Sequence, residues 1–128
     1  MTEEKLLEVI VKALDSKKGE DIKVLRVTNL TILADYFVIV GASSSTQTRA
    51  LADEVEYLTE EKLGRKPDRV QGNNGSNWIV LDYGEIIVHV FYNEQRDFYS
   101  LERLWSDGEE VDISEWTRYL GKEVHVET

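Results

Sequence analysis

Residues 36–40 (YFVIV) constrain the fold of this chain more than any other segment, because no polar residue interrupts them on either face. Side chains of a strand alternate between the two faces of a sheet, so a strand that is apolar throughout is normally covered on both sides. Residues 86–91 (IIVHVF) have the same character, whereas the charged strand expected at residues 21–27 (DIKVLRV) fits a place near a sheet edge. The sequence therefore predicts a single α/β domain with a mixed central sheet.

Two helices are predicted to flank this sheet. Thr2 can cap the first helix, and residues 17–19 (KKG) are typical of its end. The second helix is expected to begin at Ser44, which has capping-box spacing to Gln47, and to end at Gly64 before the only proline.

The composition limits the classes of function. The chain has 128 residues, no cysteine and a formal net charge of −10. Disulfides and thiolate metal sites are excluded, and direct binding to nucleic acid is not expected, because such binding depends on lysines and arginines that neutralise phosphates. No signal peptide is evident and the apolar runs are too short to span a bilayer, so a cytoplasmic protein without membrane contact is predicted. The acidity either maintains solubility or steers the chain toward a basic partner.

The stretch at residues 41–45 (GASSS) raises one enzymatic alternative. It lies between a predicted strand and a predicted helix, as in the glycine-serine turn of nucleotidyltransferases, whose paired carboxylates hold divalent metal ions. Ser43, Glu54 and Glu56 match that spacing in the sequence. However, two residues that are two apart on a helix face different directions, so these carboxylates are not expected to share a metal. We predict no catalytic residue, no metal site and no cofactor.

Asp82 and Glu85 flank a tight connection between two predicted strands, and two interpretations remain open. The residues could serve turn chemistry with exposed carboxylates, or they could present negative charge to a partner at a loop tip. His89, on the second strand, is interpreted as a packed residue that is hydrogen-bonded to a neighbour. A catalytic role would require a nucleophile and an orienting acid.

Large aromatic residues suggest a protein interface. Trp78, Tyr83 and Tyr99 are not well explained by burial alone, and partly exposed aromatics often anchor protein contacts. A helix expected at residues 96–105 carries Tyr99 and, on its apolar face, Trp105. The predicted partner-binding surface comprises Trp78, Asp82, Tyr83, Glu85, Tyr99 and Trp105.

Three blocks of the sequence resemble the ribosomal silencing factor family, called RsfS or Iojap. They are residues 35–55 (DYFVIVGASSSTQTRALADEV), 78–91 (WIVLDYGEIIVHVF) and 96–105 (RDFYSLERLW). The resemblance covers roughly residues 4 to 106. Departures are modest: Gln71 stands where relatives often have Glu, and residues 85–87 (EII) replace the commoner Asp-Val-Val.

The resemblance implies a fold similar to nucleotidyltransferases without their catalytic carboxylates. It also implies binding to the large ribosomal subunit through ribosomal protein L-fourteen, which obstructs joining of the small subunit and represses translation when nutrients are scarce. A homodimer of the free factor is a further implication, and a role in ribosome assembly, as in organellar relatives, is an alternative.

The last part of the chain is expected to be an extension of the matched domain at residues 1–106. Residues 107–128 hold seven acids against two bases and only a few apolar anchors. We predict an acidic C-terminal extension that docks locally or remains mobile, and the resemblance assigns no role to it.

Overall fold

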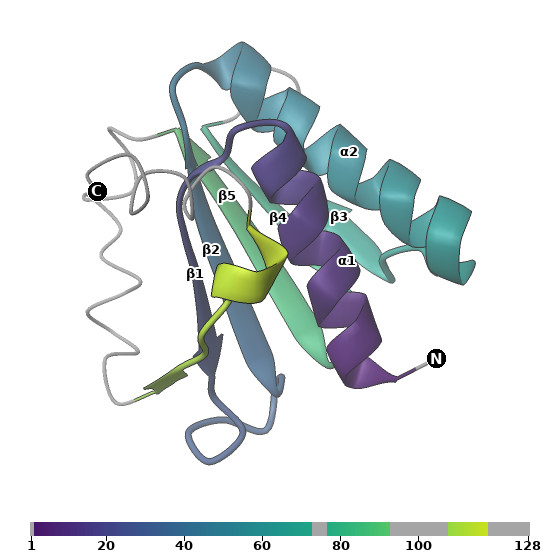
Figure 1. Ribbon diagram of the computed structural model, residues 1–128, viewed down its shortest axis with the longest axis vertical. Helices are drawn as coiled ribbons and strands as arrows, with labels where there is room; N and C mark the ends of the chain where they lie inside the picture. Colours follow the sequence, from purple (N-terminus) through teal and green to yellow (C-terminus); the bar gives the residue numbers. More distant parts are fainter. Residues whose placement is uncertain (1, 73–76, 93–107, 118–128) are drawn as a thin grey trace.

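The computed structural model describes residues 2–72, 77–92 and 108–117 (Figure 1). In chain order the elements are α1 (Glu3–Ser16), β1 (Glu20–Arg26), β2 (Tyr36–Ala42), α2 (Ser45–Leu63), β3 (Arg69–Gln71), β4 (Trp78–Asp82), β5 (Ile86–Tyr92), β6 (Glu109–Glu110) and the 3₁₀ turn η1 (Ser114–Trp116). No helix among these residues is both long and apolar enough to cross a membrane. The helix predicted at residues 96–105 lies outside the described residues.

The strands form one mixed sheet in the order β3-β4-β5-β2-β1-β6. Strands β2 and β5 pair in parallel, and the other neighbours pair antiparallel. Every residue of β2 is buried, as expected of a strand that is apolar on both faces. The single α/β domain with two central strands and a charged strand near one edge is confirmed.

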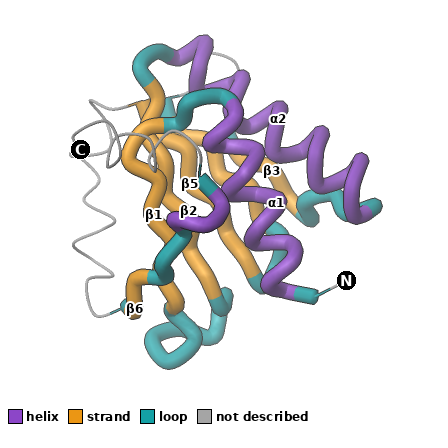
Figure 2. The backbone as a smooth tube through the Cα atoms, in the orientation of Figure 1, coloured by secondary structure: helices purple, strands orange, loops and turns teal. Residues whose placement is uncertain are grey.

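Both helices lie against the same face of the sheet (Figures 1 and 2). The hydroxyl of Thr2 accepts a hydrogen bond from the amide of Lys5, which caps α1 as predicted. The hydroxyl of Ser44 does the same for the amide of Gln47 at the start of α2. Gly64 ends α2 with φ +64°, a left-handed conformation that suits glycine. The predicted boundaries of both helices are therefore confirmed.

The sheet separates two apolar clusters. The helix-side cluster joins α1 and α2 to one face of the sheet and includes Leu14, Leu51, Val55 and Tyr83. The opposite-face cluster consists of Leu25, Val27, Ala34, Phe37, Ile39 and Phe91, with Trp78 and Ile87 packed against it. Burial on both faces explains why the central strands lack polar alternation.

The described part of the acidic extension lies against the sheet and α1. Strand β6 pairs with β1 through Arg26 and Leu25, and the amide of Val111 donates to the carbonyl of Val24 at 2.8 Å. Ile113 is buried in the helix-side cluster, and Trp116 packs against that cluster. Residues 108–117 thus add a strand and core contacts, while the division of the chain at residue 106 stays a prediction.

Candidate functional site

The turn between β4 and β5 is held by hydrogen bonds of its own. One carboxylate oxygen of Asp82 (Oδ1) accepts from the amide of Gly84 at 2.8 Å, and the amide of Tyr83 donates to the carbonyl of Ile86 at 2.9 Å. Gly84 has φ +87°, which a side chain would make unfavourable. Asp82 therefore serves turn chemistry, the first of the two interpretations drawn from the sequence.

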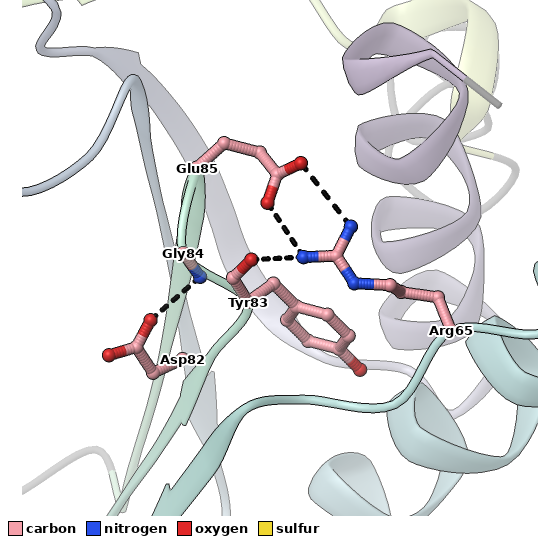
Figure 3. Close-up of polar contacts among 5 residues, drawn as sticks. All are labelled: Arg65, Asp82, Tyr83, Gly84 and Glu85. Atoms are coloured by element: carbon pink, nitrogen blue, oxygen red, sulfur yellow. Dashed lines mark hydrogen bonds and ion pairs between the residues drawn. The ribbon is translucent and has the colours of Figure 1, made fainter.

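Arg65, just after α2, binds the other side of this turn (Figure 3). Its Nη2 and Nη1 atoms lie 2.8 and 3.3 Å from the two carboxylate oxygens of Glu85, and Nη2 also donates to the carbonyl of Tyr83. These hydrogen bonds lower the pKa of Glu85, because they favour its charged form. Both interpretations drawn from the sequence assume an exposed carboxylate at Glu85, and this assumption is wrong, because the group is partly buried in a two-point ion pair with Arg65.

Tyr83 is fully buried, so the expectation that it is partly exposed is also wrong. Its ring packs in the helix-side cluster, and its hydroxyl lies 2.9 Å from that of Thr59 on α2. Burial raises the pKa of Tyr83 to about 12, because the phenolate would lose its hydration there. Tyr83 therefore positions the turn from inside, and its side chain does not reach a surface partner.

Trp78 and His89 form a second unit on the face opposite the helices. The indole N–H of Trp78 donates to Nδ1 of His89 at 3.2 Å, and the Trp78 ring stacks on Phe91 at 5.0 Å between centroids. The ring of Phe37 meets His89 edge-on at 5.2 Å. The interpretation of His89 as a packed residue that is hydrogen-bonded to a neighbour is confirmed.

His89 is neutral in this environment. Burial lowers its pKa to about 4, because the imidazolium would be desolvated. Since Nδ1 accepts from Trp78, the proton is assigned to Nε2, and this buried atom meets no hydrogen-bond partner among the described residues. The neutral imidazole therefore orients Trp78 by accepting the indole N–H.

The structure separates the predicted contact residues into two groups. Asp82 and Glu85 lie with Tyr83 at one end of β4, while Trp78 begins that strand, about 13 Å away for a strand rise of about 3.3 Å per residue. Trp78 and Asp82 are partly exposed. Tyr99 and Trp105 lie outside the described residues, so their part in the surface stays a prediction.

The residues of the enzymatic alternative do not converge. Glu54 and Glu56 both lie on α2, two positions apart, and therefore point in different directions. The amide and hydroxyl of Ser43 both donate to Oε1 of Gln47, at 2.6 and 2.7 Å, so this serine completes the cap of the helix. Within residues 2–72, 77–92 and 108–117, no three acids or histidines are grouped to hold a metal ion.

These contacts define a class of protein, namely a single α/β domain in which the polar groups of the candidate sites support structure. Comparison with known proteins gives the family. The model of the family described as "Ribosomal silencing factor during starvation" matches residues 1–127. The chain belongs to this RsfS family of non-enzymatic regulators of translation, which includes the Iojap proteins.

Individual relatives agree with this assignment. The ribosomal silencing factor RsfS of Halalkalibacterium halodurans is 34% identical over 113 residues, which are 88% of this chain and 96% of that protein. The chloroplastic protein Iojap of Zea mays is 30% identical over 105 residues, which are 81% of this chain and 45% of that protein. The crystal structure of a protein from Chromobacterium violaceum superposes with a TM-score of 0.80 at 29% identity, covering 88% of this chain and 92% of that one.

The Arg65–Glu85 ion pair predicts a measurable coupling. The coupling is measured in a double-mutant cycle of Arg65→Gln and Glu85→Gln, with urea unfolding to give the free energy of each variant. We expect a coupling free energy of about 1 kcal/mol, because both groups are partly buried and are bonded at two points. The matched control is Glu60→Gln with Lys66→Gln, an exposed pair at 3.1 Å for which less than about 0.5 kcal/mol is expected. Equal coupling in the two cycles would contradict the structural role given to Arg65.

The depressed pKa of His89 predicts a specific pH dependence of stability. In the unfolded chain the imidazole titrates near 6.5, whereas in the folded chain it titrates near 4, so the unfolded state binds more protons between these values. Stability is therefore full above about pH 6.5 and falls as the pH drops toward 4, by up to about 3 kcal/mol. His89→Gln should flatten this part of the curve in urea unfolding at pH 7 and pH 5, and an unchanged slope would refute the assignment.

Proposed function

We propose that the chain silences translation by binding the large ribosomal subunit through ribosomal protein L-fourteen, where its bulk obstructs joining of the small subunit. Membership of the RsfS family implies association with the large subunit. A chain of 128 residues has a radius of gyration of about 14 Å, hence a diameter of about 35 Å, and a body of that size is large enough to separate two closely apposed particles. No chemical step is needed.

The observation that carries the proposal is the fixed, partly exposed ring of Trp78. It is held by the hydrogen bond to His89 and by stacking on Phe91, so it keeps one orientation before a partner arrives. An aromatic anchor that is already ordered loses little side-chain entropy on binding, which strengthens the contact. Trp78 is therefore the proposed centre of the interface.

Charge supports a basic ribosomal protein as the partner. The net charge of −10 repels exposed RNA and attracts lysine and arginine side chains, which favours one docking site on a particle rich in RNA. Asp82 supplies a partly exposed carboxylate at the edge of this surface. Glu85 contributes less to the proposed contact, because Arg65 already balances its charge.

The proposed anchor is tested by Trp78→Ala in calorimetry with isolated ribosomal protein L-fourteen. Loss of the ring should weaken binding about tenfold to a hundredfold, as for aromatic hot spots. The control is Tyr57→Ala on α2, which removes an aromatic side chain that is 59% exposed and should leave binding unchanged. Trp78→Phe, which retains the apolar ring, should fall between. Binding by Trp78→Ala at the strength of the unmodified chain would remove Trp78 from the interface.

The role of charge is tested separately with Asp82→Asn, whose amide oxygen can still accept from Gly84. We expect association to slow about twofold to fivefold and to depend less on salt, since an attractive charge is lost without damage to the turn. Stopped-flow or surface kinetics at several salt concentrations measures this effect. Asp53→Asn on α2 removes an equal charge elsewhere, and an equal slowing in that control would mean that only net charge matters.

A further inference from the structure

The end of the sheet nearest the start of α1 carries a surface that the Trp78 site does not use. Strand β6, the loop between β1 and β2, and the first turns of α1 all lie at this end (Figure 2). Arg26 and Tyr36 face each other across the β1–β2 ladder, and residues 27–35 connect them as a loop. Two features meet here, namely an exposed apolar loop tip and an acidic pocket at its base.

The loop presents aliphatic side chains to solvent. Ile32 is fully exposed, and Leu33 and Leu30 are 70% and 41% exposed. The loop is closed by hydrogen bonds from the amides of Leu30 and Thr31 to the carbonyl of Val27, at 2.9 and 3.1 Å. Three aliphatic side chains within four consecutive residues of a closed loop form an apolar patch, a common mark of a protein contact.

The pocket lies at the base of this loop, between α1, the sheet and the acidic extension. Its volume is about 440 Å³, and Tyr36 and Trp116 supply aromatic walls. The guanidinium of Arg26 stacks over the Tyr36 ring at 5.1 Å and pairs with Glu109 of β6 at 3.1 Å. Glu109 therefore already pairs with the positive charge of Arg26 at the protein surface.

Three further carboxylates line the pocket, and none pairs with a base among the described residues. They belong to Glu4 of α1 and to Asp112 and Glu115 of the extension. The amide of Ser114 donates to Asp112 at 2.9 Å, which lowers the pKa of that carboxyl and keeps it charged. The pocket thus combines uncompensated negative charge with aromatic walls, beside an apolar loop.

We propose that this surface docks a basic segment of a protein partner, with one arginine side chain in the pocket and neighbouring apolar side chains on the Leu30–Leu33 tip. A guanidinium fits the pocket because it binds carboxylates at two points and can stack on the partly exposed ring of Trp116, whereas Arg26 already covers Tyr36. Nucleic acid is disfavoured by the carboxylates, which repel phosphates. The aliphatic tip extends the contact beyond what a free amine would use. The docking surface is distinct from Trp78 and does not require it.

The test uses the full chain, labelled with ¹⁵N, and a capped six-residue peptide of leucine and alanine with one central arginine. In NMR titrations the peptide should shift the signals of residues 27–36 and 109–117, including the Trp116 indole. A peptide with citrulline in place of arginine keeps the shape without the charge, and it should bind about tenfold more weakly.

Paired variants separate the two halves of the surface. The double variant Asp112→Asn with Glu115→Gln should weaken binding of the arginine peptide about tenfold. The control, Asp53→Asn with Glu60→Gln, removes the same charge from another acidic pocket of about 370 Å³ beside α2 and should leave binding within about twofold. The double variant Ile32→Ser with Leu33→Ser should weaken binding of the arginine peptide and of the citrulline peptide to the same degree.

Three results would overturn the proposal. They are an arginine peptide that leaves these signals unmoved, a citrulline peptide that binds as well as the arginine peptide, and an equal loss of binding in the Asp53 and Glu60 control. Each result can be told apart from a failure of the Trp78 interface, because these titrations contain no ribosomal protein.

Discussion

Strands β2 and β5 lie side by side in parallel, and this pairing organises the rest of the molecule. Parallel neighbours cannot be joined by a tight turn, so the chain must cross over between them, and α2 makes most of that crossing on one face of the sheet. The chain then runs along β4 and turns at residues 82–85 into β5, which pairs antiparallel with β4. The carbonyl of Glu85 accepts from the amides of Asp35 and Tyr36 at 2.8 and 3.1 Å, which ties this turn to the start of β2.

Several polar side chains around these strands make hydrogen bonds that stabilise the fold. Ser43 and Gln47 complete a helix cap, Arg65 fixes the β4–β5 turn, and His89 orients Trp78. Each of these groups could have suggested chemistry when taken alone. Together they hold neighbouring side chains and turns in place, and an ordered surface loses less entropy on binding, which favours the proposed binding role.

The sequence predicts well those features that depend on local pattern. Residues 36–40 predict a central strand because both of its faces are apolar. Ser44 and Gly64 predict the ends of α2 because they are residues typical of an N-cap and a C-cap. It does not predict that Arg65 pairs with Glu85, since twenty residues separate them and no periodicity links them. Burial alone does not explain Tyr83 well in the sequence, yet its ring packs in the helix-side cluster and its hydroxyl lies 2.9 Å from that of Thr59 on α2. Ile113 reaches the core, whereas the sequence leaves open whether the extension docks locally or remains mobile. Such contacts depend on how distant elements meet, which one local pattern does not encode.

The central claim, that this acidic domain keeps ribosomal subunits apart by occupying space on one of them, is tested most directly by sedimentation. Purified small and large subunits are mixed under conditions that favour joining, with the chain at concentrations up to saturation of the large subunit. We expect the chain to migrate with the large subunit and joined ribosomes to disappear in proportion to its occupancy. Joined ribosomes that form undiminished while the chain remains bound to the large subunit would contradict obstruction by the chain.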